Sequence, residues 1–368
     1  MVEFLCTICS KTYPIDTDVW HCECGGIFEV TDLPAFDPKA IITDEYTLWR
    51  YRRLFSFEDE AHIVSMGEGF TPIVETNIYG LPIQAKLEYM SPTGSYKDRG
   101  ASVLVSYLNR FDKLRPVVED SSGNAGASLA AYTARIGIKA RVFVPADASG
   151  PKLSQIAIYG AELNPVEGPR SAAEQAAHEA AEKEYYASHV YNPLFMIGLR
   201  TFAYEVVEQL GWRAPDNIVF PVGHGTFLLS TYRGFQHMLD AGVIDRMPRF
   251  FAVQARACDP IFQAYRRGFE DVQPVVAGAT VAEGIRIAGP PRGRQVLEAI
   301  RTSGGAVLTV TDREIIRARR AMARLGLFIE PTSAAAVAGL RKLDKMLDSE
   351  NVTVVPLTGS GLKAPVTP

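Results

Sequence analysis

Residues 86–102 read KLEYMSPTGSYKDRGAS and place a lysine, Lys97, directly after a turn and at the start of a helix. A lysine in the first turn of a helix is locally unfavourable because the helix macrodipole is positive there. That position disfavours the ammonium form, and the free amine is the form that bonds covalently to an aldehyde. The stretch therefore predicts a reactive amine, while a solvated lysine beside Asp98 is the simpler interpretation of these residues taken alone.

Outward from Lys97, predicted strands alternate with predicted helices. Apolar side chains recur on one side of residues 97–110, and Thr311 and Glu314 have the spacing of a capping box at the start of a helix over 311–325. Near-continuous apolar runs, which are typical of parallel strands covered on both faces, occur at 115–119, 139–144, 217–222, 249–254 and 352–357. The alternation predicts an α/β fold with mostly parallel twisted sheets.

The chain has 368 residues, more than one typical domain, so we expect two lobes and a small N-terminal module. The module is predicted at residues 1–32. Residues 33–95 and 206–368 are predicted to form a large lobe, and residues 96–205 a small lobe that carries Lys97. The active site is expected in the cleft between the two lobes.

Two loops with glycines follow predicted strands. The first, DSSGNAGAS at 120–128, has small residues that let backbone N–H groups approach an anion at a helix start. We expect it to hold a substrate carboxylate, with the Asn124 side chain free to bond a ring hydroxyl. The residues assigned to the substrate are Ser121, Ser122, Gly123 and Ala125. An ordinary strand-to-helix turn remains the alternative.

The second loop, PVGHGT at 221–226, has the composition of a phosphate-binding turn. Its expected donors are the backbone amides of Gly223, His224, Gly225 and Thr226, and the His224 ring is given no catalytic role. Thr358, in TGSGLK at 358–363, ends the last predicted strand. This places it at the carboxyl edge of a sheet, where α/β proteins bind ligands.

Four of the five cysteines, Cys6, Cys9, Cys22 and Cys24, lie within the first 24 residues. Two short-spaced pairs followed by Gly25 and Gly26 resemble a zinc ribbon, in which four thiolates bind a structural metal ion. The second pair is tighter than the usual spacing, and reduced structural cysteines are the alternative. A closed four-thiolate site has no open position for water, so we expect a structural role.

Composition narrows the class of protein. The formal net charge is -4, which argues against a duplex-binding protein because such proteins need a basic face. No stretch approaches the roughly 20 apolar residues of a membrane span, and the N-terminus has no secretory pattern. We therefore expect a cytoplasmic protein with neither a membrane nor a nucleic acid as partner.

Taken together and in this order, these motifs resemble those of pyridoxal-phosphate enzymes of the tryptophan-synthase-β fold type, and specifically of threonine synthases. The resemblance extends over nearly the whole chain. Besides the cysteine module and the lysine segment, it rests on GEGFTP at 67–72, SSGNAGAS at 121–128, NP…GLRT at 192–201, PVGHGT at 221–226, IRIAGP at 285–290, EPTSA at 330–334 and TGSGLK at 358–363.

The resemblance implies a fold type II lyase of amino-acid biosynthesis that acts on a small amino acid, and by analogy a homodimer. It implies that Lys97 carries pyridoxal 5'-phosphate as a Schiff base and serves as the catalytic acid and base. Asn124 would then meet the cofactor's phenolic oxygen, residues 223–226 its phosphate, and the Thr358 hydroxyl its pyridine nitrogen.

The substrate is where this chain departs from the family. Threonine synthases act on phosphohomoserine, and their matching segment resembles NPxRxEGQKT, whose arginine helps to bind the substrate phosphate. Here the segment reads NPLFMIGLRT, so that Phe195 stands where the arginine is expected. A phenyl ring supplies no charge-assisted hydrogen bonds, each worth about 1.5–3 kcal/mol. Glu283, in AEGIRIA at 282–288, is a second departure.

Three arginines, Arg286, Arg292 and Arg294, offer a substitute anion site, although Arg292 and Arg294 are more simply interpreted as surface residues of a loop. We expect elimination or replacement on phosphohomoserine or a related amino acid. The alternatives are deamination of serine or threonine, and β-replacement on serine or phosphoserine. An alternative from another class of protein is a binding protein, in which a catalytically inactive cofactor-binding fold is joined to a zinc ribbon.

Overall fold

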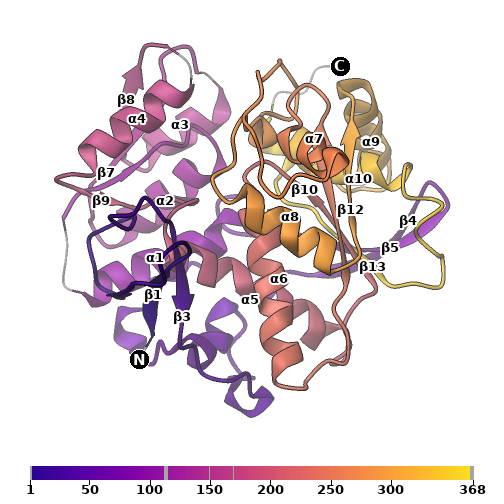
Figure 1. Cartoon of the computed structure of the whole chain (residues 1–368), viewed down its shortest axis with the longest axis horizontal. Helices are drawn as coiled ribbons and strands as arrows, with labels where there is room; N and C mark the ends of the chain where they lie inside the picture. Colours follow the sequence, from indigo (N-terminus) through magenta and orange to yellow (C-terminus); the bar gives the residue numbers. More distant parts are fainter. Residues whose placement is uncertain (1, 112–114, 149, 169, 365–368) are drawn as a thin grey trace. The chain divides into compact units, whose positions relative to one another are not determined.

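The computed structural model describes residues 2–111, 115–148, 150–168 and 170–364, and the chain divides into two compact units (Figure 1). The first unit contains Met1–Phe70 and Ser91–Thr201, and the second contains Thr71–Met90 and Phe202–Pro368. Within the described residues no helix is long and apolar enough to cross a membrane.

The first unit is built on a four-stranded sheet in the order β8 (Glu162–Val166), β7 (Ala140–Pro145), β6 (Val117–Glu119), β9 (Tyr185–Tyr186). All three pairings are parallel, so the carboxyl ends of the four strands lie at one edge. The helices are α1 (Lys97–Arg110), α2 (Asn124–Arg135), α3 (Pro151–Ile158), α4 (Arg170–Ala180) and the start of α5 (Pro193–Gln209). The loops that precede α2 and α5 therefore begin at the same edge.

Residues 33–70 were predicted with the large lobe, yet they fall in the first unit. Their aromatic side chains pack on α1, which explains this placement. The Trp49 Nε1 donates to the Ser102 hydroxyl over 2.9 Å, and the Tyr107 hydroxyl donates to the carbonyl of Phe55 over 2.9 Å. The same unit contains the antiparallel sheet β2 (Thr12–Pro14), β1 (Glu3–Cys6), β3 (Phe28–Thr31) at the N-terminus.

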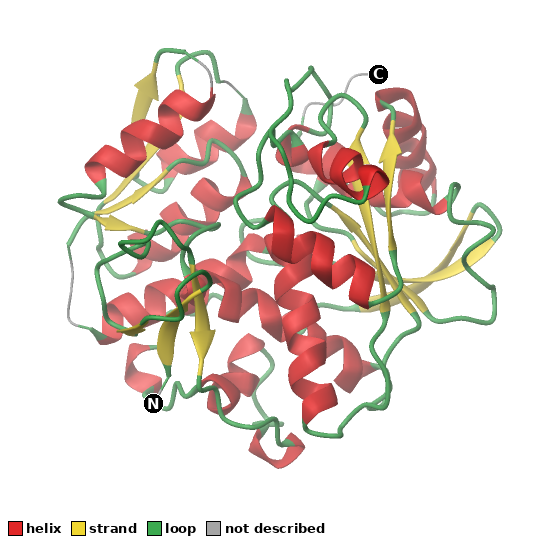
Figure 2. Cartoon of the chain, in the orientation of Figure 1, coloured by secondary structure: helices red, strands yellow, loops and turns green. Residues whose placement is uncertain are grey.

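The second unit is built on a six-stranded sheet. Its order is β12 (Ala306–Val310), β11 (Arg249–Ala255), β10 (Asn217–Pro221), β13 (Thr353–Pro356), β5 (Leu81–Lys86), β4 (Ile73–Ile78). Every pairing is parallel except β4 with β5. The helices are α6 (Thr226–Asp240), α7 (Pro260–Arg267), α8 (Gly293–Thr302), α9 (Asp312–Arg324) and α10 (Pro331–Leu340) (Figure 2). Short 3-10 helices complete the chain at Pro38–Ala40, Leu48–Phe55, Glu60–His62, Glu88–Met90, Glu283–Ile285 and Gly361–Lys363.

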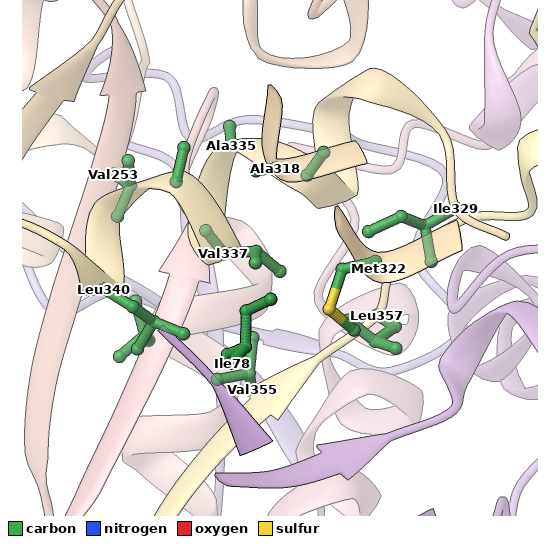
Figure 3. Close-up of a cluster of buried hydrophobic side chains, with 14 of the residues drawn as sticks. Ile78, Val253, Ala318, Met322, Ile329, Ala335, Val337, Leu340, Val355 and Leu357 are labelled. Carbon is green, nitrogen blue, oxygen red and sulfur yellow. The ribbon is translucent and has the colours of Figure 1, made fainter. Parts of the chain in front are cut away.

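The core of the second unit lies between the sheet and α9 and α10. Figure 3 shows Val253 of β11 and Val355 of β13 together with Met322 of α9 and Val337 of α10. A side chain at Gly339 would come within 2.5 Å of Val253, so this glycine lets α10 approach the sheet. Burial on both sides explains why these strands are continuously apolar.

All five predicted strands are confirmed, as are the helix over 97–110 and the capping box at Thr311 and Glu314. Among the strands that were not predicted, β12 has an apolar run (AVLTV), whereas β8 and β9 lack one. β8 contains Pro165 and exposed residues, and β9 has only two residues. Pairing within the sheet, rather than local pattern, makes these segments strands.

Candidate functional site

Lys97 is the first residue of α1 and is half-buried. The neighbouring Asp98 is fully buried and accepts hydrogen bonds from the Thr93 backbone (2.7 Å), the Thr93 hydroxyl (2.5 Å) and the Ser128 hydroxyl (2.6 Å). Asp98 thus fixes the turn before α1 and ties it to α2. The simpler interpretation, a solvated lysine beside Asp98, does not fit, because Asp98 is buried and Lys97 is half-buried.

Phe195 closes one side of the space around Lys97. Its ring is 1% exposed, and its centroid lies 5.7 Å from the Lys97 Nζ. Gly100, one turn along α1, lies under the ring, and any side chain there would overlap it. Phe195, which stands where the resemblance predicts an arginine, is therefore packed into the core of the first unit beside the lysine.

The loop before α2 begins directly after β6, and Gly123 is the N-cap of the helix. The structure places Ser121, Ser122 and Gly123 in this turn, followed by Asn124 and Ala125 as the first two residues of α2. Their backbone N–H groups therefore lie at a helix N-terminus. The hydrogen bond from Ser128 to Asp98 brings this helix start beside the start of α1.

The loop before α6 lies in the second unit, and its glycines have no space for a side chain. Gly225 is the N-cap of the 15-residue α6 with φ +79°, a left-handed conformation that favours glycine. A Cβ there would lie 2.5 Å from Val296, and one on Gly223 would lie 2.9 Å from the Cα of Ile285. Backbone amides of Gly223, His224, Gly225 and Thr226 thus line a helix N-terminus that is suited to an anion.

A chain of contacts links this loop to Thr358. Residues 284–287 pack against Gly223, and the N–H of Gly284 donates to the Thr332 hydroxyl over 3.1 Å. The next residue, Ser333, accepts a hydrogen bond from the Thr358 N–H over 2.9 Å. The Thr358 hydroxyl is buried and has no hydrogen-bond partner among the described residues.

An unpaired buried hydroxyl costs free energy, and a ring nitrogen of a ligand would satisfy it. Together with the glycine loop, it fits a cofactor that carries both a phosphate and a pyridine nitrogen. Lys97 and Asn124 belong to the first unit, whereas Gly223–Thr226 and Thr358 belong to the second.

Sequence reasoning missed a buried acidic pair beside Lys97. Glu119, the last residue of β6, is 1% exposed and is followed by Asp120, which is 9% exposed. The His189 Nδ1 lies 2.6 Å from a Glu119 oxygen, and the Tyr186 hydroxyl donates to Asp120 over 2.9 Å. Two acidic residues at the end of an apolar strand, Glu119 and Asp120, were the available signal, because buried carboxylates are rare without a role.

The interpretation of Arg292 as a surface residue is wrong, since this residue is 1% exposed. It is the N-cap of α8, and the next residue, Gly293, has no space for a Cβ beside Val272. Arg286 and Arg294 are exposed, and so is Glu283.

The four N-terminal cysteines converge. Their Sγ atoms all lie within 4.8 Å of one another, with Cys6 to Cys24 at 3.5 Å and Cys9 to Cys22 at 3.6 Å. Four sulfurs at about 2.3 Å from a tetrahedral ion lie about 3.8 Å apart, so the cluster fits one metal ion. The Tyr13 hydroxyl donates to the Cys22 Sγ over 3.2 Å, and chiefly this bond lowers the pKa of Cys22 to about 6.

The cysteine module contacts the sheet of the first unit through Trp20. Its ring stacks on His178 of α4 at 4.4 Å and meets Tyr186 edge-on at 5.2 Å. The face of α4 that carries His178 is therefore packed against the cysteine module. Burial lowers the pKa of His178 and favours its neutral form.

Comparisons with known proteins bear on the cofactor and on the fold. Residues 64–359 match the family model described as pyridoxal-phosphate dependent enzyme. The chain is 36% identical to the threonine synthase of Methanocaldococcus jannaschii, over 98% of this chain and 92% of that protein. It is 34% identical to the threonine synthase of Methanosarcina acetivorans, over 100% and 93%. The crystal structure of a T.th. threonine deaminase matches with a TM-score of 0.68 and 23% identity, over 81% of this chain and 94% of that one, and supports the fold alone.

Proposed function

The chain belongs to the family of pyridoxal-phosphate dependent enzymes as a threonine synthase-like lyase, and we propose that it catalyses elimination or replacement on a small hydroxyamino acid, serine or threonine. The observation that carries the choice of substrate is Phe195. Its buried ring occupies the position beside Lys97 where a phosphate-binding arginine is expected.

The residues of both units have separate duties in this proposal. The backbone amides of residues 223–226, at the N-terminus of α6, would hold the cofactor phosphate, and the buried Thr358 hydroxyl would bond its pyridine nitrogen. A hydroxyl does not hold that nitrogen protonated as a carboxylate would, so the electron sink is tempered. Lys97 would anchor the cofactor, and Asn124 would bond its phenolic oxygen.

When bound, pyridoxal phosphate supplies the electron sink that allows a bond at the substrate Cα to break. With the cofactor bound, the Lys97 Nζ would be placed to take the proton from the substrate Cα and to give it to the departing hydroxyl group, which would leave as water. The loop at Ser121, Ser122, Gly123 and Ala125 holds the substrate carboxylate with backbone N–H groups at the start of α2. Phe195 keeps water from one side of the amine.

The relatives named threonine synthase make phosphohomoserine the competing substrate. Purified protein with cofactor is offered phosphohomoserine, threonine, serine and phosphoserine, and both product release and changes in the visible spectrum are followed. We expect turnover with serine or threonine and weak turnover with phosphohomoserine. Robust release of threonine and phosphate from phosphohomoserine would overturn the argument from Phe195.

A variant pair tests whether the activity belongs to Lys97. Lys97→Ala removes the anchoring amine, and we expect the visible absorbance of the bound cofactor and all turnover to be lost. Lys139→Ala removes an exposed lysine that pairs with Glu162, and it serves as the matched control. A binding protein without activity would keep the absorbance and show no turnover with any of the four amino acids.

For the N-terminal module we propose a structural zinc ion bound by Cys6, Cys9, Cys22 and Cys24, supported by the spacing of their sulfur atoms. Metal analysis of protein purified without chelators should return about one zinc ion per chain, and a metal-free result contradicts this. A homodimer and a cytoplasmic location stay predictions.

A further inference from the structure

Glu119 and His189 form a buried pair that the proposed reaction does not use. Glu119 ends β6, and His189 follows β9, the parallel neighbour of β6. The pairing continues past β9, because the N–H of Ala187 donates to the carbonyl of Val118 over 2.9 Å. This register carries His189 to the Glu119 carboxylate although the two residues are far apart in the sequence.

Both oxygens of the Glu119 carboxylate are engaged by His189. One lies 2.6 Å from the ring Nδ1, and the other accepts the backbone N–H over 3.3 Å. The Glu119 and His189 side chains are 1% and 5% exposed. Such a pair is costly to bury, and its geometry holds one proton between a carboxylate and an imidazole.

The pair lies within electrostatic reach of Lys97. Burial raises the pKa of Glu119 most and the charge of Asp120 raises it further, whereas the charge of Lys97 opposes this rise. The His189 N–H and Arg170 of α4 oppose it less. Coulomb coupling is mutual, so the charge on Glu119 acts equally on Lys97.

Phe195 keeps this coupling strong. Its ring centroid lies 6.2 Å from the His189 ring and 5.7 Å from the Lys97 Nζ. An apolar, fully packed ring beside both groups excludes water, and charges interact more strongly where water is excluded.

We propose that Glu119 and His189 act as a positioning pair that sets the charge beside the Lys97 amine. While the pair holds its proton it is neutral overall, and after it releases the proton it carries one negative charge. The negative pair stabilises the Lys97 ammonium, and the neutral pair does not. The inference rests on the proposed role of Lys97.

Other charged groups lie around the pair, in the loop before α2 and on α4. Asp120 lies in the loop before α2, and Arg170 and Glu174 lie on α4, where Glu174 faces Asp120. Tyr186 of β9 donates to Asp120. Glu174→Gln therefore removes a partly buried carboxylate of the same unit without touching the pair, and it is the matched control.

The test measures the pH at which the Lys97 amine loses its proton, in protein without the cofactor. Full-length protein is acetylated with trace acetic anhydride at a series of pH values, and modification of Lys97 is quantified by peptide mass spectrometry. In Glu119→Gln we expect the pH midpoint of Lys97 labelling to fall by about one unit. Glu174→Gln should leave it in place. An unmoved midpoint in Glu119→Gln, or an equal shift in Glu174→Gln, overturns the proposal.

A reciprocal measurement covers the case in which Glu119→Gln does not fold. The His189 ring is followed by NMR as a function of pH, with its signal assigned by its loss in His189→Gln. In Lys97→Ala the release of the pair's proton should shift to higher pH, because an opposing positive charge is gone. An unshifted curve overturns the proposal.

The two proposals fail separately. If the protein binds no pyridoxal phosphate, the proposed function fails although the labelling shift can still occur. If the cofactor binds and the enzyme turns over its substrate, while neither the Lys97 labelling curve nor the His189 titration moves, the pair has no influence on Lys97. This inference alone then fails.

Discussion

The loop before α2 and the loop before α6 have the same construction and different surroundings. Each follows a parallel strand and ends in a glycine N-cap. The first comes after two buried acidic residues, Glu119 and Asp120, whereas the residues before the second, at 217–222, are uncharged. A dianionic phosphate would be repelled at the first loop and not at the second. Two glycine N-caps that each follow a parallel strand are thus distinguished by the charge of the strand end that precedes them.

The two loops also differ in backbone conformation and in the space for side chains. Gly225 has φ +79° and no space for a Cβ, whereas the nearest atom to a Cβ on Gly123 would be the Ser121 hydroxyl at 3.6 Å. The second loop therefore brings bare backbone amides to its ligand. The first presents hydroxyl and amide side chains as well, which suits a smaller and less charged carboxylate.

The largest effect is expected from a substitution that disrupts the second loop. Gly225→Val imposes an unfavourable φ and a clash with Val296, so the affinity for pyridoxal phosphate should fall about 100-fold. Spectroscopic titration with pyridoxal, which lacks the phosphate, should show little change in the same variant. Gly123→Ala is the matched control and should bind the cofactor normally. Equal losses for both aldehydes would assign the phosphate elsewhere.

A smaller effect is expected from breaking the first loop. A side chain at Gly126 would overlap the backbone carbonyl of Ser121. Gly126→Ala should therefore raise the KM for the amino acid about tenfold, since the carboxylate donors are displaced, and leave cofactor affinity unchanged. Steady-state kinetics with saturating cofactor measures the first and titration the second. A loss of cofactor affinity without a change in KM would reverse the two assignments.

Removal of the metal from the N-terminal module should affect the surroundings of the first loop and not those of the second. Trp20 stacks on His178 and contacts Tyr186, which donates to Asp120 beside the first loop. Chelation should therefore accelerate amide hydrogen exchange in α4 and β9 several-fold and leave α6 and β10 unchanged. Uniform acceleration in both units would show that the module has no local effect on the first loop.

The smallest expected effect is a pH dependence of stability. Burial first, and then Asp120, raise the pKa of Glu119, so the folded chain holds this proton more tightly than the unfolded chain. Stability from this residue is therefore present below the usual carboxyl range and lost as pH rises towards the raised value. Glu119→Gln does not titrate, so its melting temperature relative to the parent chain should rise by a few degrees between pH 4 and pH 8. A difference that does not change with pH would contradict the buried charge.

The sequence predicted the two loops and missed what surrounds them. Local pattern was sufficient for the five apolar strands, for α1 and for the glycine turns, because each depends on neighbouring residues. The contact between Glu119 and His189 depends on β9, a two-residue strand that has no pattern of its own. The stacking of Trp20 on His178 likewise joins segments that only the fold brings together.

The account depends most on Lys97 as the covalent anchor of the cofactor. Protein saturated with pyridoxal phosphate is reduced with borohydride, digested and mapped by mass spectrometry. The account predicts one reduced adduct per chain, on the peptide that contains Lys97. An adduct on another lysine, or none at all, would contradict it.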